Sequence, residues 1–404
     1  MSIAERQISL WRSRPFTLLL SSVLLLTVGN KMYEIVLPLM MYDITHSSVS
    51  VASMRTAELL PNFLFAVLIG VLVDRVNKKK WVMWMVGSQA LLLFIFGYLF
   101  QMNIHILIVY YALGFLLMTF NYGFFNAQVS MVKLSVAPSQ LTSANAKFAF
   151  MDTLISIMGP AFSGILLLFT NMAYGIWTTA GCYILSLIIL NRLPFESERP
   201  AHGNETSFVQ AFREGFVHFF SQKLLLLVTV FVMLFNCTTT VVGTTIIFLA
   251  KDVLHLQSSM LAAILSMTGL GGLLGSLLIS KLRSRLGLGK IFGLSTLLCG
   301  LSYALFFLTH NLATFIFALF MYGLAGALYN ISVYTFRQEQ SPARLMGRIA
   351  GITGMLFRTG MPIAVFASGW IVLWWGTYSI FLISAVFNIT LFGIYMFTRL
   401  WKIS

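Results

Sequence analysis

Four ionisable residues interrupt two stretches of the chain that are otherwise apolar. Lys31 and Glu34 fall in the first stretch, and Arg55 and Glu58 fall in the second. Residues three apart share one face of an α-helix, so each pair can form an ion pair within its own helix. A neighbouring cation stabilises an ionised carboxylate, whereas burial favours the neutral acid. A movement that separates such a pair would therefore drive proton uptake by a carboxylate.

The helices that carry these pairs must cross a membrane. The 404-residue chain is 58% hydrophobic and only 9% charged, whereas about a quarter of the residues of a soluble protein are charged. A hydrocarbon core about 30 Å thick needs roughly 20 apolar residues in a helix. The sequence contains twelve such spans, near 15–43, 49–73, 81–101, 104–131, 141–169, 171–191, 223–249, 258–281, 288–309, 312–336, 346–375 and 377–398. We therefore expect an all-α integral membrane protein.

An ionisable residue near the centre of a membrane helix costs at least about 2.5–3.5 kcal/mol and usually faces a cavity or a partner. The first two spans run in opposite directions, and counting from their ends places Glu34 and Glu58 at similar depth. We therefore expect a four-charge cluster. It has two interpretations: proton exchange by one carboxylate, or a structural lock between the two helices.

Asp152 and Arg358 are further candidates for proton coupling. They lie near mid-depth of the fifth and eleventh spans, at near-equivalent positions of the two halves of the chain. They could form part of a gate between the halves, or Arg358 could pair with Glu58. A structural pair is the alternative to either coupling role.

The basic residues orient the spans. The net charge of +14 comes mainly from Lys and Arg in alternate loops, and the intervening loops carry almost no positive charge except Lys251. Cytoplasmic loops of membrane proteins show this excess of positive charge. Both termini are therefore expected in the cytoplasm, and the bases require no nucleic-acid partner.

A polar stretch divides the spans into six and six. We expect an N-terminal bundle at 1–192, a cytoplasmic linker at 193–222 and a C-terminal bundle at 223–404. From Ser207 the linker has the phenylalanine spacing of an amphipathic helix on the inner membrane surface. The halves echo each other, and a repeat of this kind places a substrate site between them near the middle of the membrane.

The loop between the second and third spans carries the most specific motif. Residues 70–80 read Gly-Val-Leu-Val-Asp-Arg-Val-Asn-Lys-Lys-Lys. The loop resembles the Gly-x-x-x-Asp-Arg/Lys-x-Gly-Arg/Lys-Arg/Lys signature of the major facilitator superfamily. Asn77 stands where the signature has its second glycine, and Asn is the residue that next most readily takes a positive φ. The resemblance implies two six-helix bundles that move a solute by alternating access.

Three further segments are similar to bacterial facilitators of the macrolide-efflux and enterobactin-exporter group. They are Leu141-Thr-Ser-Ala-Asn145, Phe212-Arg-Glu-Gly-Phe216 and Ser341-Pro-Ala-Arg-Leu-Met-Gly-Arg348. This resemblance implies export in exchange for protons across the bacterial cytoplasmic membrane. We expect a monomer in the lipid bilayer that needs no cofactor. In this fold the first helix lines the cavity, so Glu34 is the preferred proton carrier and Glu58 the second.

The superfamily resemblance also implies a conformational latch. Asp74 would hold the cytoplasmic ends of the halves together near the start of the eleventh helix, where the positive end of the helix dipole stabilises a carboxylate. Gly70 and Arg75 belong to the same loop, and Arg344 and Arg348 precede that helix. The alternative is that these charges serve topology only.

The fifth span contains Gly159-Pro160-Ala-Phe-Ser-Gly164, which resembles the antiporter signature of this superfamily. The glycines allow close helix packing, and the proline permits a bend. The stretch from Tyr110 to Gln128 lacks the arginine that many proton-coupled drug exporters carry in the fourth span. The resemblance therefore supports export more strongly than it supports proton coupling.

Candidates for the substrate cavity come from the first, fourth, seventh and tenth spans. They are Asn30, Phe120, Asn121, Tyr122, Phe125, Asn126, Asn236, Tyr322, Tyr329 and Asn330. Aromatic, amide and hydroxyl groups suit an amphipathic organic molecule better than a bare ion.

We therefore expect a secondary active transporter that exports amphipathic small molecules, such as a macrolide-like drug or a siderophore, in exchange for protons. The alternative is a lipid or metabolite carrier of the same fold without proton coupling. A membrane enzyme is disfavoured, because the sequence contains neither a metal-binding cluster nor a glycine-rich phosphate loop.

Overall fold

The computed structural model describes residues 10–65, 76–137, 172–194, 219–340 and 352–403, and scattered positions within 69–73, 140–159 and 216–217. Every regular element in these residues is helical. Ten helices there are long and apolar enough to cross a membrane. They correspond to ten of the twelve expected spans. The second span is a shorter helix, and most of the fifth lies outside the described residues.

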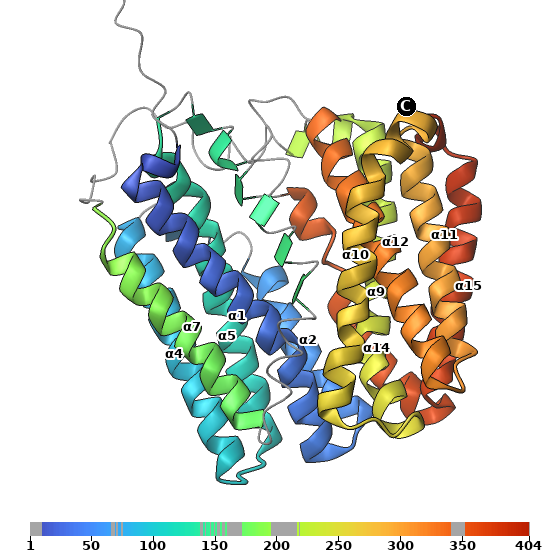
Figure 1. Cartoon of the computed structure of the whole chain (residues 1–404), viewed down its shortest axis with the longest axis horizontal. Coiled ribbons are helices and arrows are strands. Elements are labelled where there is room, and N and C mark those ends of the chain that lie inside the picture. Colours follow the sequence, from blue (N-terminus) through green and yellow to red (C-terminus); the bar gives the residue numbers. More distant parts are fainter. Residues whose placement is uncertain are drawn as a thin grey trace, which may run out of the picture.

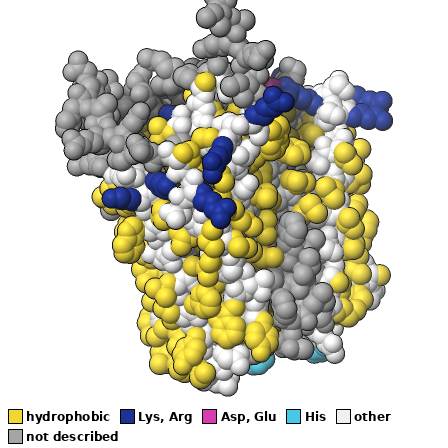
Figure 2. All heavy atoms as spheres, turned by 60° about the vertical axis from the view of Figure 1, so that its left-hand side comes forward, with side chains coloured by type: hydrophobic (Ala, Val, Ile, Leu, Met, Phe, Trp, Pro, Cys, Tyr) yellow, Lys and Arg dark blue, Asp and Glu magenta, His cyan; other side chains and the backbone are white. Residues whose placement is uncertain are grey.

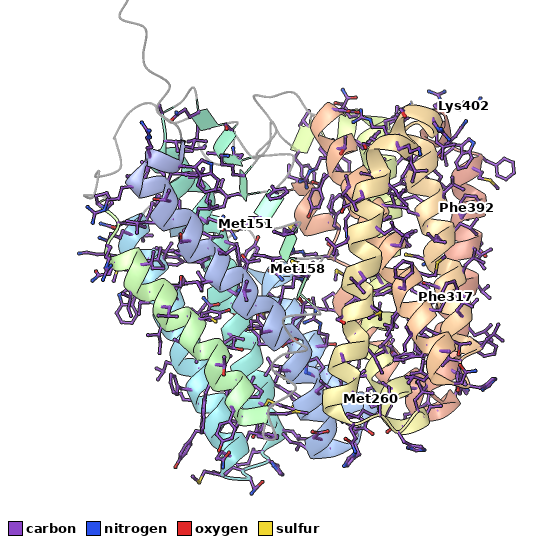
Figure 3. The ribbon with its side chains drawn as sticks, viewed as in Figure 1. Met151, Met158, Met260, Phe317, Phe392 and Lys402 are labelled. Carbon is purple, nitrogen blue, oxygen red and sulfur yellow. The ribbon has the colours of Figure 1, made fainter. Side chains whose placement is uncertain are left out.

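The helices form two groups that stand side by side (Figure 1). The N-terminal group consists of α1 (Arg14–Thr45), α2 (Ser48–Leu64), α4 (Lys78–Gln101), α5 (Leu107–Ser135) and α7 (Met172–Asn191). The C-terminal group consists of α9 (Lys223–Phe248), α10 (Ser258–Leu286), α11 (Leu288–Phe307), α12 (Leu312–Gln340), α14 (Met361–Trp375) and α15 (Thr377–Met396). Lys402 and Met260 mark the two opposite ends of the C-terminal group (Figure 3).

Asn77 acts as the N-cap of α4. Its side-chain oxygen accepts a hydrogen bond from the backbone N–H of Lys80 at 3.1 Å. Its φ is −62°, so the expectation that Asn replaces glycine here for a positive φ is wrong. A side-chain oxygen at this position satisfies one of the free N–H groups of the first helical turn.

The two groups meet closely at the end marked by Met260. Ser48 at the start of α2 donates a hydrogen bond to the backbone oxygen of Gly369 in α14 at 2.9 Å. A Cβ atom on Gly369 would lie only 2.7 Å from the Cβ of Ala52, so this approach requires glycine. Tyr42 of α1 donates a hydrogen bond to Asp252, in the π-helical turn Leu249–Val253 that follows α9. These contacts close the gap between the groups at this end.

The eleventh span is interrupted. Residues 352–356 are helical, 357–360 form a turn, and α14 begins at Met361 with Pro362 in its first turn. Proline fits the first turn of a helix because the N–H that it lacks would have no helical partner there. The amide nitrogen of Asn236 in α9 donates a hydrogen bond at 3.2 Å to the backbone oxygen of Phe357. The break brings Arg358 to an exposed position near the middle of the span.

Candidate functional site

Three ion pairs join the four charged residues of the first two helices. Lys31 Nζ lies 2.8 Å from Glu34 Oε2, and Arg55 Nη2 lies 2.6 Å from Glu34 Oε1. Arg55 Nη1 lies 2.9 Å from Glu58 Oε2. We call these four residues the α1–α2 ion cluster. Its formal charge is zero, and the opposite charges offset part of the cost of placing ionisable groups at membrane depth.

The two ends of the cluster differ in their access to solvent. The Glu58 side chain is 0% exposed and that of Arg55 14%, whereas the Glu34 side chain is 36% exposed. One oxygen of Glu58, Oε1, is buried and has no hydrogen-bond partner among the described residues. Glu34 is therefore the more accessible of the two carboxylates, while Glu58 stays against Arg55.

Gly159 links the fifth span to this cluster. A Cβ atom on Gly159 would lie 3.2 Å from the Cβ, Cγ and Cδ atoms of Lys31. The glycine thus lets the backbone of the fifth span pack against the aliphatic stem of Lys31. Pro160 and Gly164 of the same motif lie outside the described residues.

Several other predicted residues also lie outside the described residues. They are Asp152 in the fifth span and the expected latch residues Gly70, Asp74, Arg75, Arg344 and Arg348. Their roles stay predictions. Arg358 is not the partner of Glu58, because Glu58 binds Arg55 and Arg358 takes part in none of the ion pairs formed between described residues.

Two of the expected cavity residues form a hydrogen-bond network inside the N-terminal group. The Asn121 amide nitrogen donates to Asn30 Oδ1 at 2.6 Å and to Gln89 Oε1 at 3.3 Å. The hydroxyl of Tyr183 also donates to Asn30 Oδ1. Sequence reasoning missed Gln89 and Tyr183, and the only available signal was a polar side chain in the third and sixth spans. This network ties α1, α4, α5 and α7 together.

The remaining α5 candidates are half-buried. Asn126 donates from its amide nitrogen to the backbone oxygen of Tyr122 at 2.8 Å, within its own helix. Tyr122 and Phe125 pack against the hydrophobic core, and Phe120 is half-buried as well.

The C-terminal group contains a partly open, polar cavity of about 140 Å³. It includes three of the expected residues, Asn236, Tyr329 and Asn330, and also Arg337 and Arg358. The ring of Tyr329 stacks on that of Phe235, with the centroids 3.7 Å apart. Tyr322 is not one of the lining residues, and its hydroxyl lies 3.4 Å from the backbone oxygen of Thr239.

A family model and two known bacterial proteins match most of this chain in sequence. A sequence model of the Major Facilitator Superfamily matches residues 19–365 and 239–401. The proposed bacilysin exporter BacE of Bacillus subtilis (strain 168) is 23% identical over 299 residues, which are 72% of each chain. The staphyloferrin A transporter of Staphylococcus aureus is 21% identical over 314 residues, which are 75% of this chain and 76% of that protein.

Solved structures share the fold at low sequence identity. A mutant form of the nucleoside transporter NupG has a TM-score of 0.77 and 16% identity, over 95% of this chain and 99% of that one. A bacterial homologue of the iron transporter ferroportin in an inward-facing state has a TM-score of 0.70 and 15% identity, with the same coverage. Together with the ten apolar helices, these likenesses confirm the expected all-α membrane fold.

Proposed function

This chain belongs to the major facilitator superfamily, and we propose that it exports amphipathic organic molecules across the bacterial cytoplasmic membrane in exchange for protons. The family makes the chain a membrane transporter. Export is supported by the relatives, one of which is a proposed bacilysin exporter and another a staphyloferrin A transporter. The observation that carries proton exchange is the α1–α2 ion cluster, in which one carboxylate is buried and the other accessible.

The arrangement of the two helical groups supports an inward-facing state. The contacts of Tyr42 with Asp252 and of Ser48 with Gly369 close the end marked by Met260. On the face drawn in Figure 2, Lys and Arg side chains gather at the other end, which carries the C-terminus in Figure 1. Basic residues favour the cytoplasmic side. We therefore place the closed end outside the cell and both termini in the cytoplasm.

A transport cycle follows from the state of Glu34. In the inward-facing state Glu34 is ionised and held by Lys31 and Arg55, as it would be after release of a proton to the cytoplasm. A substrate then binds from the cytoplasm and is carried outward. When the site faces outward, Glu34 takes up a proton, and its hold on Arg55 weakens. Arg55 keeps Glu58 as its partner, so this arginine is not left without a carboxylate during the return step.

The direct test is the accumulation of drugs and dyes in an efflux-deficient bacterium that expresses the protein, compared with cells carrying the empty vector. We expect lower accumulation of amphipathic compounds, and we expect a protonophore to abolish the difference. Export that persists with the protonophore would contradict proton exchange and support an uncoupled lipid or metabolite carrier. Equal accumulation of every compound in the two strains would contradict the export of amphipathic drugs.

A further inference from the structure

The cavity in the C-terminal group contains two arginines that lack an acidic partner among the described residues. Arg337 and Arg358 both line it. Four ion pairs join described residues, and neither arginine takes part in any of them. The guanidinium of Arg337 instead lies 5.1 Å from the ring centroid of Tyr334. The described residues that line the cavity therefore include two arginines and no acidic side chain, in contrast to the neutral α1–α2 ion cluster.

The two arginines lie at different depths. Arg358 is exposed in the turn at 357–360, beside Asn236 in the middle of α9. Arg337 is half-buried and lies three residues before the end of α12. An unpaired guanidinium within a membrane protein is costly, and such groups commonly mark the path of a solute.

The other groups that line the cavity suit a molecule with a charged group attached to an apolar body. The hydroxyl of Tyr329 is buried and has no hydrogen-bond partner among the described residues. The amide of Asn330 is exposed at the same cavity, which also has apolar walls from Val232 and Phe357. Guanidinium groups bind carboxylates and phosphates through two parallel N–H donors.

We infer that this cavity binds an anionic group of the transported molecule, a carboxylate attached to an apolar or aromatic body, through Arg358 and Arg337. The inference rests on the proposed function and adds the charge of its substrate. Arg337, at the cytoplasmic end of α12, meets the anion first, and Arg358 holds it near the middle of the membrane.

The test is dye binding to the purified full-length protein in detergent, measured by fluorescence anisotropy with a protein-free micelle blank. Fluorescein and rhodamine 6G are xanthene dyes of similar size, and the first is an anion whereas the second is a cation. Wild type is compared with Arg358→Gln, Arg337→Gln and the charge-preserving Arg358→Lys. Arg283→Gln is the matched control, because Arg283 pairs with Glu339 and does not line the cavity.

We expect wild type to bind fluorescein more tightly than rhodamine 6G. Arg358→Gln should weaken fluorescein binding at least tenfold, or about 1.4 kcal/mol, and Arg337→Gln should weaken it less. Arg358→Lys should recover part of the loss, and Arg283→Gln should leave binding unchanged. The inference is overturned if wild type does not bind fluorescein, if it prefers rhodamine 6G, or if Arg358→Gln binds fluorescein as tightly as wild type.

The outcome is separable from that of the proposed function, because binding in detergent needs no proton gradient. The protein could bind fluorescein through Arg358 and yet export nothing when a proton gradient is present. That result would support the anion site and contradict proton exchange. Gradient-driven export by a protein that binds only rhodamine 6G would support proton exchange and rule out the anion site.

Discussion

Arg55 of α2 reaches Glu34 of α1, with 2.6 Å between Arg55 Nη2 and Glu34 Oε1. The same guanidinium holds the fully buried Glu58 through its other terminal nitrogen. One arginine is thus shared by two carboxylates, of which only Glu34 has appreciable access to solvent. Neutralising Glu34 leaves Arg55 paired, whereas neutralising Glu58 leaves it with a half-exposed partner. This asymmetry is the basis for assigning the proton to Glu34.

The first prediction concerns stability. Arg55→Met leaves Glu58 buried without its cation, and breaking a buried ion pair in this way costs about 3–5 kcal/mol. We expect a large fall in the thermal unfolding temperature of the purified protein. The double variant Arg55→Met/Glu58→Leu should recover most of the loss, because both buried charges are gone. Lys31→Met is the control, and we expect a smaller effect because the Lys31 side chain is partly exposed. A double variant no more stable than Arg55→Met would contradict a coupled buried pair.

The second prediction concerns Gly159. A Cβ atom at this position would lie 3.2 Å from three carbons of the Lys31 stem, and that flexible stem can shift by a few tenths of an ångström. We therefore expect Gly159→Ala to keep most of the efflux rate and Gly159→Leu to abolish it by displacing Lys31 from Glu34. Adding Lys31→Ala to Gly159→Leu should relieve the clash and restore the protein stability that the clash costs. If Gly159→Leu transports like wild type, the packing of the fifth span on the cluster is not required.

The third prediction concerns the closed end of the transporter. Valine at position 369 would clash with Ala52, so we expect Gly369→Val to favour the state that is open outside. The readout is labelling of Ser48→Cys by a membrane-impermeant thiol reagent, in a variant with Cys182, Cys237 and Cys299 replaced. Labelling should speed up in Gly369→Val. Gly393→Val is the control, since a Cβ atom there meets no described atom within 4 Å apart from its own helix backbone. Equal labelling rates for Ser48→Cys alone, with Gly369→Val and with Gly393→Val would contradict the placement of this contact on the outer side of the membrane.

The long helices could be predicted closely from the sequence. The seventh span was expected at 223–249, and α9 runs from Lys223 to Phe248. A membrane helix is defined by its own length and apolarity, so neighbours contribute little to its bounds. The grouping of Lys31, Glu34, Arg55 and Glu58 also followed from the sequence, because spacing and depth fix the helical face and level of each side chain.

The sequence did not show which neighbour each polar side chain would meet. Asn30 and Asn121 are predicted to face the substrate cavity, and the sequence did not show that Asn30 accepts hydrogen bonds from Asn121 and Tyr183. A polar residue in a membrane helix must avoid lipid, and a cavity and a polar neighbour on another helix meet that need equally well. For the same reason, the sequence did not show that Arg337 lines the cavity together with Arg358.

The measurement that tests the central claim most directly is proton movement coupled to substrate in liposomes. Purified wild type and Glu34→Gln are reconstituted with a trapped pH-sensitive dye, and a compound that the cells expel is added as a pulse. Glu339→Gln is the control, because Glu339 is an exposed carboxylate remote in sequence from the α1–α2 ion cluster and paired with Arg283. We predict proton movement opposite to the compound for wild type and Glu339→Gln, and none for Glu34→Gln, which should still bind the compound. Transport by wild type without proton movement, or equal proton movement by Glu34→Gln, would contradict the account.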